Sequence, residues 1–448
     1  MTRDAVLPPG PRVPVPLQTV AWIVRAPEVM DACARRYGGA FTMRLPRLDP
    51  LVFVSDPEDV KAVFTGSAEL LHAGEANELL EPILGSESIL LLDEQRHLRQ
   101  RKLMLPAFHG DRLKRYRDQM RAVTEAELAR WPRGLSEPAR PRMQDITLEI
   151  IMRTVFGLEE GERLARLRSA LKGLLEWTTA RRRLFVAIVA GPKRVSQSDV
   201  FGLTKARAAA DELIFDEIRR RSEEGGLAER EDVLSMLLQA RDEEGRPMTP
   251  VELRDELMTL LVAGHETTAT ALAWAVEQLA RHPEALARLE GGEEEYLDAV
   301  VQETLRLRPV IVVVVRRLTE AMELGGYSLP AGSNVAPCIY LMHRRPEIYP
   351  DPEAFRPERF LETPPGTYTW LPFGGGIRRC LGAQFAQMEM KVVLSTLLEN
   401  ARLRPTTARP ERAIRRAITF VPDRGGEIVL DEAPAGRLAA AAHPSARA

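Results

Sequence analysis

Helical periodicity dominates the middle of the chain. From about residue 93 to residue 289, apolar positions recur every three or four residues, as on one face of a helix. The clearest segment starts at Thr249-Pro250-Val251-Glu252, where a capping box is followed by proline at the first helical position. It predicts a helix that ends before His282-Pro283 and is roughly 45 Å long. Because residues 257–280 are apolar on nearly every face, we expect this helix to cross the molecule, buried all round.

The rest of the pattern predicts further helices and short strands. Helices are expected after Asp56-Pro57, over residues 293–307, and over residues 381–399 at the end of the chain. Short apolar runs between glycine and proline turns predict strands at 40–44, 51–54, 322–324, 327–329 and 334–339. The chain is therefore predicted to be mainly α with small β-sheets.

The domain organisation follows from length and local composition. A chain of 448 residues often divides into two domains, but no linker interrupts the middle of this one. We expect an extended, proline-rich leader over 1–18 and one large domain over 19–430. Residues 431–448 are rich in alanine, proline and arginine and are expected to be disordered.

Composition excludes several function classes. The 62 basic and 64 acidic residues nearly cancel, so the chain lacks the concentrated basic footprint of a nucleic-acid-binding protein. Its apolar stretches are too short to span a membrane, and its first residues do not resemble a signal peptide. The three cysteines, Cys33, Cys338 and Cys380, lie far apart, which favours a reducing compartment and a cytoplasmic protein.

One short segment carries the strongest chemical signal, Phe373-Gly374-Gly375-Gly376-Ile377-Arg378-Arg379-Cys380-Leu381-Gly382. Three successive glycines allow the backbone to approach something flat. Cys380 is expected in the first turn of the last helix, where free N–H groups and the helix dipole lower the pKa of a thiol. Such a thiolate is a good ligand for iron. The alternative is a buried structural cysteine after a glycine loop.

The segment resembles the haem-binding loop of the cytochrome P450 family. That family's pattern of phenylalanine, glycine, arginine, cysteine and glycine is filled by Phe373, Gly376, Arg378, Cys380 and Gly382. The resemblance covers roughly residues 9–430 and implies the cytochrome P450 fold, with haem b between the long central helix and the cysteine-loop helix. It also implies that Cys380 is the axial ligand and that Arg378 pairs with a haem propionate.

The long helix contains a second match, Ala263-Gly264-His265-Glu266-Thr267-Thr268, which resembles the family's oxygen-activation motif. Proton delivery to dioxygen in a dry pocket requires a relay, and Glu266 and Thr267 are the predicted catalytic pair. Gly264 is expected to let the helix loosen for water. The alternatives are a Thr267 hydroxyl bonded back to the preceding turn and a solvated Glu266. His265 is given no role.

Weaker matches extend the resemblance. Glu303 and Arg306, three residues apart on one helix, are expected to form a structural triad with the later Arg359.

His97 and Arg101 match the helix that reaches the propionates from the other side, where many family members have tryptophan in place of His97. Arg316 fits a further propionate-binding position, although its neighbour Arg317 leaves that assignment open by one residue.

The resemblance implies a monooxygenase that inserts one oxygen atom of dioxygen into a hydrophobic substrate such as a fatty acid or terpenoid. Electrons would come from NAD(P)H through a separate ferredoxin or flavodoxin and its reductase. The expected pocket residues are Leu260, Ala263, Val312 and Thr419, and the expected docking cations are Arg99, Lys102, Arg379 and Lys391. A peroxide-driven haem-thiolate enzyme and a non-catalytic haem protein are the rival hypotheses.

Overall fold

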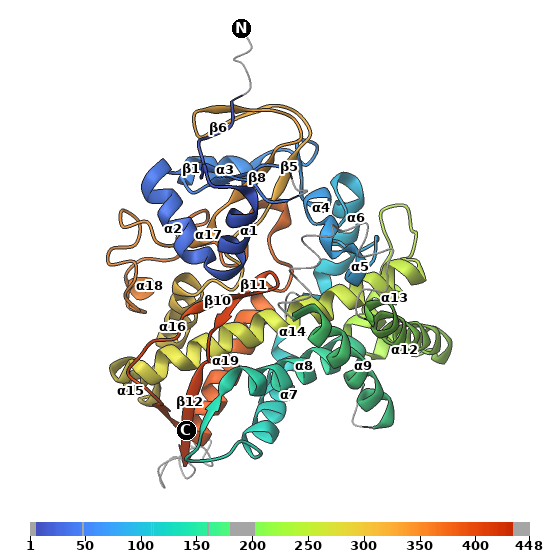
Figure 1. Cartoon of the computed structure of the whole chain (residues 1–448). Helices are drawn as coiled ribbons and strands as arrows, with labels where there is room; N and C mark the ends of the chain where they lie inside the picture. Colours follow the sequence, from blue (N-terminus) through green and yellow to red (C-terminus); the bar gives the residue numbers. More distant parts are fainter. Residues whose placement is uncertain are drawn as a thin grey trace.

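One long helix, α14 (Pro250–Arg281), passes through the middle of the protein (Figure 1). The structure is a computed structural model and describes residues 6–46, 49–108, 110, 112–158, 161–179 and 202–432. The predicted capping box of α14 is confirmed: the Glu252 amide donates to Thr249 Oγ1 (3.2 Å), and the Thr249 amide donates to Glu252 Oε2 (2.7 Å). Both bonds satisfy N–H groups that a helix end otherwise leaves without partners.

Helices make up most of the described chain, as expected. The other helices are α1 (Val15–Val24), α2 (Ala26–Tyr37), α3 (Pro57–Thr65), α4 (Ala73–Ala76), α5 (Glu81–Leu84), α6 (Glu94–Met104), α7 (Arg112–Leu128), α8 (Ala139–Phe156), α9 (Glu162–Thr179), α12 (Leu203–Glu224), α13 (Val233–Gln239), α15 (Pro283–Glu290), α16 (Glu294–Leu307), α17 (Ile339–Met342), α18 (Arg359–Glu362) and α19 (Ala383–Asn400).

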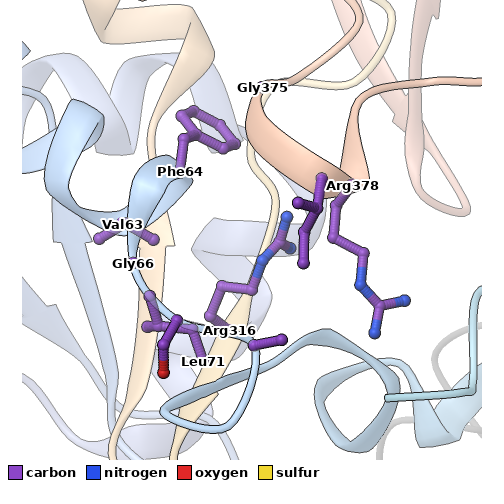
Figure 2. Close-up of a pocket in the computed structure, with 10 residues that line it drawn as sticks. Val63, Phe64, Gly66, Leu71, Arg316, Gly375 and Arg378 are labelled. Atoms are coloured by element: carbon purple, nitrogen blue, oxygen red, sulfur yellow. The ribbon is translucent and has the colours of Figure 1, made fainter. Parts of the chain in front are cut away.

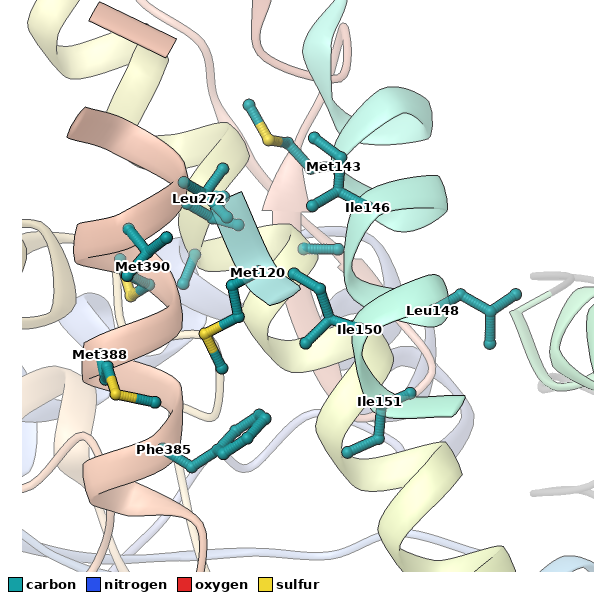
Figure 3. Close-up of a cluster of buried hydrophobic side chains, with 14 of the residues drawn as sticks. Met120, Met143, Ile146, Leu148, Ile150, Ile151, Leu272, Phe385, Met388 and Met390 are labelled. Carbon is teal, nitrogen blue, oxygen red and sulfur yellow. The ribbon is translucent and has the colours of Figure 1, made fainter. Parts of the chain in front are cut away.

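The main apolar core lies among α7, α8, α14 and α19, where α14 and α7 each pack against α8 and α19. Figure 3 shows its buried side chains, among them Met120 of α7, Ile150 of α8, Leu272 of α14 and Met390 of α19. Other helices cover α14 on several sides, which accounts for apolar residues on nearly every face of this helix. This packing holds the middle of α14 in a fixed position relative to the loop that precedes α19.

The strands form small sheets at the edges of this helical body. The largest has the order β1-β2-β8-β5-β3, in which only β2 and β8 run parallel. The strands are β1 (Ala40–Met43), β2 (Leu51–Val54), β3 (Leu71–His72), β4 (Ser136–Pro138), β5 (Arg316–Leu318), β6 (Met322–Leu324), β7 (Tyr327–Leu329), β8 (Asn334–Pro337), β9 (Ala401–Pro405), β10 (Ala413–Arg416), β11 (Thr419–Pro422) and β12 (Glu427–Glu432).

Three boundaries differ from the predictions. The leader expected to be extended over 1–18 is already helical from Val15, because Pro14 and Pro16 sit before and within the first turn, where proline is tolerated. The last helix begins at Ala383, so Cys380 precedes it. Asp431 and Glu432 pair with β9 as part of β12, whereas the remainder of the expected tail lies outside the described residues.

Among the helices that the structure describes, none is both long and apolar enough to cross a lipid bilayer.

Candidate active site

Cys380 lies in the interior of the protein, yet its side chain is accessible. Its backbone amide donates to the Phe373 carbonyl (3.0 Å), which closes the loop between the two residues. Burial raises the pKa of the Cys380 thiol, while the Gly382 amide and the nearby Arg101 and Arg379 act in the opposite direction. The expectation of a lowered thiol pKa is therefore wrong for the polypeptide without haem. The cause is that α19 begins three residues later, so burial outweighs the few N–H groups near the sulfur.

The glycines of the cysteine loop have different roles. A Cβ on Gly376, which has φ +63°, would lie 1.8 Å from the Phe64 carbonyl oxygen, and one on Gly375 would lie 3.0 Å from the Phe64 ring. The close approach predicted for this loop is thus made to α3 of the same chain. By contrast, a Cβ on Gly382 would meet no protein atom within 4 Å. Protein packing does not explain a glycine at that position, beside the cysteine.

Several basic side chains lie close to the cysteine loop. Arg316 of β5 and Arg378 line one cavity together with Phe64 and Gly375, as Figure 2 shows. Arg378 donates to the Asp93 carboxylate (2.6 Å) and to the Ile89 carbonyl (3.1 Å).

Helix α6 contributes two further residues to this group, His97 and Arg101. Arg101 Nη1 donates to the Arg379 carbonyl (2.8 Å). His97 is buried, and its Nδ1 has no hydrogen-bond partner in the described structure.

The electrostatics of this group favour an anion. Burial, together with the charges of Arg378 and Arg101, lowers the pKa of His97 to about 3. Burial also lowers the pKa of Arg316 and that of Arg378 to about 10 each. Asp93 is the one carboxylate whose charge opposes these effects at all three groups. Negative charge placed among these side chains would therefore be strongly stabilised.

Arg316 and its neighbour Arg317 face in different directions. Arg316 is buried and lies close enough to Arg378 for the two charges to repel. Arg317 instead pairs with Asp49 (2.5 Å) and Glu75 (3.4 Å) at the surface. The alternation of side chains along β5 thus directs Arg316, and not Arg317, toward the cavity.

On α14, the two residues of the predicted proton relay are bonded elsewhere. Glu266 is buried and accepts from Arg140 Nη2 (2.5 Å) and Gln144 Nε2 (2.8 Å), both on α8, so it is not a solvated helix charge. Thr267 Oγ1 donates to the Ala263 carbonyl (2.6 Å), the bond to the preceding turn that was the alternative interpretation.

The neighbouring residues tie α14 to α8. A Cβ on Gly264 would lie 3.2 Å from Ile151 Cδ1, so the glycine permits close helix packing, and α14 is continuous through it. His265 Nδ1 bonds Thr147 Oγ1 (3.0 Å), and burial lowers the pKa of His265 to about 4.

The structure brings Glu303, Arg306 and Arg359 together. Arg306 donates to both carboxylate oxygens of Glu303, at 2.6 and 2.9 Å, and Arg359 Nε donates to Glu303 Oε1 at 3.1 Å. All three side chains are buried. A charge group this well satisfied inside the protein has the character of a structural element.

The expected pocket residues differ in accessibility. Ala263 is exposed although it lies in the middle of the most buried helix, and Leu260, one turn earlier, is half-buried. Val312 and Thr419 are buried, and Thr419 Oγ1 donates to the Arg416 carbonyl (2.8 Å). Ala263 and, in part, Leu260 are therefore accessible, as Cys380 is, whereas Val312 and Thr419 are covered by the protein.

Three residues with a part in this geometry were not singled out from the sequence. Asp93 holds Arg378 from 285 positions away, and its place just before a helix signals only a cap. Arg140 pairs with Glu266 across 126 positions, and Phe64 packs on the glycine loop, contacts for which the sequence carries no local signal.

These residues fit a haem group. A thiol is a soft ligand for one iron position, and it is accessible inside the protein beside a glycine with open space next to it. The unpartnered Nδ1 of His97 and the cations Arg101, Arg316 and Arg378 match the two carboxylates that haem carries.

Comparison with known proteins agrees with this geometry. The family model "Cytochrome P450" matches residues 8–426. The chain is 44% identical over 440 residues to a Mycobacterium tuberculosis protein named cytochrome P450 135B1, covering 95% of this chain and 92% of that one. It is 39% identical over 442 residues to cytochrome P450 135A1 of the same species, covering 96% of each.

Solved structures show the same fold. The retinoic-acid-bound cyanobacterial CYP120A1 matches with a TM-score of 0.82 and 24% identity, covering 96% of this chain and all of that one. The haem domain of cytochrome P450DA matches with a TM-score of 0.82 and 23% identity, covering 96% and 99%. Together, the family match, the close relatives and the fold show that this chain belongs to the cytochrome P450 family and is a haem-thiolate monooxygenase.

Proposed function

We propose that this monooxygenase holds haem b through Cys380 and oxidises a hydrophobic substrate such as a fatty acid or terpenoid in the cytoplasm. Its electrons would come from NAD(P)H through a ferredoxin or flavodoxin and the matching reductase. The observation that carries the proposal is the accessible interior thiol beside a group of cations that the protein leaves short of anions.

The side chains of this chain would divide the work of binding. Cys380 Sγ would ligate the iron, and its deprotonation would be assisted by the Gly382 amide and by Arg101. Arg316, Arg378 and His97 would hold the propionates, with Asp93 keeping the Arg378 guanidinium in place. When bound, haem supplies the activation of dioxygen, which no side chain can provide.

Proton delivery would depend on a change of partners at Glu266. Its carboxylate is held by Arg140 and Gln144 and must release at least one of them and take up a proton from solvent before it can pass that proton to Thr267 Oγ1. In the Thr267→Ala variant, we expect haem binding to persist and the coupled rate of product formation to fall by about 10–100-fold, with more peroxide released. Coupling equal to that of the wild type would contradict the relay.

The rival hypotheses are a peroxide-driven enzyme and a non-catalytic haem protein. Turnover with a reductase pair and NADPH or NADH, compared with peroxide as the only oxidant, separates them. Product that forms faster with the electron donors than with peroxide supports the proposal. Turnover with peroxide that equals or exceeds turnover with the electron donors, or none under either condition, would contradict it.

The electron donor would dock near Arg379, the exposed arginine next to the ligand. Of the four expected docking cations, Arg379 has no carboxylate partner in the described structure. Arg99 is committed to Asp242 and Glu252, both at 2.7 Å. Lys102 and Lys391 pair with surface acids, Glu243 and Asp298, from which a partner could displace them.

Charge reversal tests this docking surface. Reduction by an acidic donor should slow in the Arg379→Glu/Lys102→Glu variant, and reduction of the wild type should slow as salt rises. Peroxide-driven activity should stay unchanged. Equal loss of both activities would assign these residues to haem binding or folding.

The substrate class follows from the apolar residues on the accessible side of α14, Leu260 and Ala263. Spectral shifts on adding a panel of fatty acids, terpenoids and polar aromatic compounds would test it. Shifts confined to the polar compounds would overturn the hydrophobic assignment.

A further inference from the structure

The N-terminal helix α1 buries polar side chains and exposes apolar ones. Its buried side contains Gln18 and Thr19, together with Trp22. Leu17, Val20 and Val24 are each at least half exposed. Because these three positions are separated by three and four residues, they form one apolar stripe on the outer side of the helix.

The inward polar groups are fully used within the protein. Gln18 Nε2 donates to the carbonyls of Val13 (2.9 Å) and Pro11 (3.2 Å), while its Oε1 accepts from the Arg44 amide (3.0 Å). Thr19 Oγ1 donates to the Val15 carbonyl (2.9 Å). These bonds fix the rotation of α1, so the helix cannot turn its apolar stripe inward without losing them.

Exposed apolar side chains are concentrated around this helix. Of the twelve large hydrophobic residues that are exposed in the described chain, five lie within residues 6–24. The β10–β11 hairpin packs beside α1, with the Arg415 guanidinium 5.2 Å from the centre of the Trp22 ring, and exposed Ile418 lies at its turn. Scattered single apolar residues are ordinary on a protein surface, but a group like this one marks an interaction site.

The charged residues next to the stripe in the sequence are all basic. The sequence has no acidic residue between Asp4 and Glu28. Arg12 and Arg25 flank α1, and Arg44 lies beside it through the bond of its amide to Gln18. All three arginines are exposed, and none pairs with a carboxylate in the part of the chain that the structure describes.

We propose that this face, formed by α1 and its three flanking arginines, binds the surface of an anionic lipid bilayer. A ten-residue helix is roughly 15 Å long, too short to span a membrane but suited to lie in its interface with the apolar side down. The arginines would meet the lipid phosphates. A second copy of the chain fits less well, because a symmetric pair would bring the same unpaired arginines together with no acid to neutralise them.

Sedimentation with vesicles tests the proposal on the full-length, haem-loaded protein. The wild type should bind vesicles of phosphatidylcholine with phosphatidylglycerol more tightly than vesicles of phosphatidylcholine only. The Leu17→Glu/Val20→Glu variant should bind the anionic vesicles at least about tenfold more weakly. Leu135→Glu is the matched control, since Leu135 and Leu17 are both 58% exposed, and it should bind like the wild type.

The arginines are tested separately. Each of Arg12→Gln and Arg25→Gln should weaken binding to anionic vesicles by about fivefold, and high salt should have the same effect. The carbon-monoxide spectrum of each variant checks that it has folded around haem, independently of any vesicle result.

Three outcomes would overturn the proposal. The first is a wild type that binds no vesicles, and the second is equal loss in the Leu135→Glu control. The third is a concentration-dependent dimer that Leu17→Glu/Val20→Glu disrupts in the absence of lipid, which would assign the stripe to a second copy of the chain.

Discussion

Two buried groups of charged side chains in this protein differ in how completely they are satisfied. In the closed cluster, Glu303, Arg306, Arg359 and His343, every Arg306 donor group has a partner: Glu303 and the carbonyls of His343, Pro352 and Ala354. His343 uses both ring nitrogens, with the Arg306 carbonyl (3.1 Å) and the Leu371 amide (2.8 Å).

The open cluster, His97, Arg101, Arg316 and Arg378, is built in the opposite way. Among the residues that the structure describes, His97 Nδ1 has no partner, and the Arg316 side chain donates only to the carbonyl of Val315, its own neighbour. Buried cations without anions cost free energy, which a protein recovers only if a ligand supplies the missing charge. The closed cluster therefore has the character of a structural element, and the open cluster has the character expected of the proposed site for the haem carboxylates.

The largest effect is expected on the carbon-monoxide spectrum when Cys380, the proposed iron ligand beside the open cluster, is replaced. Cys380→Ser should abolish the red-shifted band of the reduced carbon-monoxide complex, because an alcohol cannot replace thiolate donation. Cys33→Ser, at a buried cysteine in another core, should keep the band. A Cys380→Ser variant that retains the band would refute the ligand assignment.

Breaking the closed cluster should cost the most stability. Glu303→Gln leaves Arg306 and Arg359 buried without a counter-charge and should lower the free energy of unfolding by about 3–5 kcal/mol. The urea midpoint measures this. Glu293→Gln removes an exposed partner of Arg288 and should leave the urea midpoint almost unchanged, because exposed ion pairs contribute little to stability. Similar shifts in the two variants would mean that the closed cluster stabilises the fold no more than an exposed ion pair does.

Removing a charge from the open cluster should weaken haem retention but should not lower the stability of the haem-free protein. Arg316→Met should weaken haem retention by roughly 1.5–3 kcal/mol, the range for a hydrogen bond to a charged group, while the haem-free protein becomes no less stable. Arg317→Met, which affects a surface pair, is the control and should retain haem normally. Transfer of haem to an acceptor globin measures retention. Loss of haem-free stability in Arg316→Met would mean that Arg316 is structural.

The smallest effect is a pH dependence of the haem-free protein. The pKa of His97 is lowered to about 3, below its ordinary value of 6.5, so below about pH 6.5 the unfolded chain takes up a proton that the folded chain does not. The stability tied to His97 is therefore complete above pH 6.5 and is lost as pH falls toward 3, at ~1.4 kcal/mol per pH unit.

His97→Gln should remove this contribution, so its stability should decline less steeply between pH 6.5 and 5 than that of the wild type. The decline that remains would include His343, whose pKa burial also lowers. Denaturant titrations at several pH values measure both slopes, and identical slopes would contradict the burial of a neutral His97.

Sequence reasoning succeeded where the signal is local. The capping box of α14, the strand at 51–54 and the pairing of Glu303 with Arg306 depend on residues a few positions apart, whose spacing sets their geometry. It was wrong where a boundary of a few residues mattered. The last helix was predicted to start at residue 381, two residues too early, with Cys380 in its first turn. That placement predicted a lowered thiol pKa, whereas burial raises it.

By itself, the sequence determined the family, through the loop that contains Cys380, and the long central helix, because each is encoded in a continuous run of residues. Only the tertiary structure decided that Glu266 is held by Arg140, that Asp93 anchors Arg378, and that Arg316 rather than Arg317 turns inward. Contacts between residues far apart in the chain, and the burial that shifts pKa values, arise from how whole elements pack. The pattern along a single element does not contain that information.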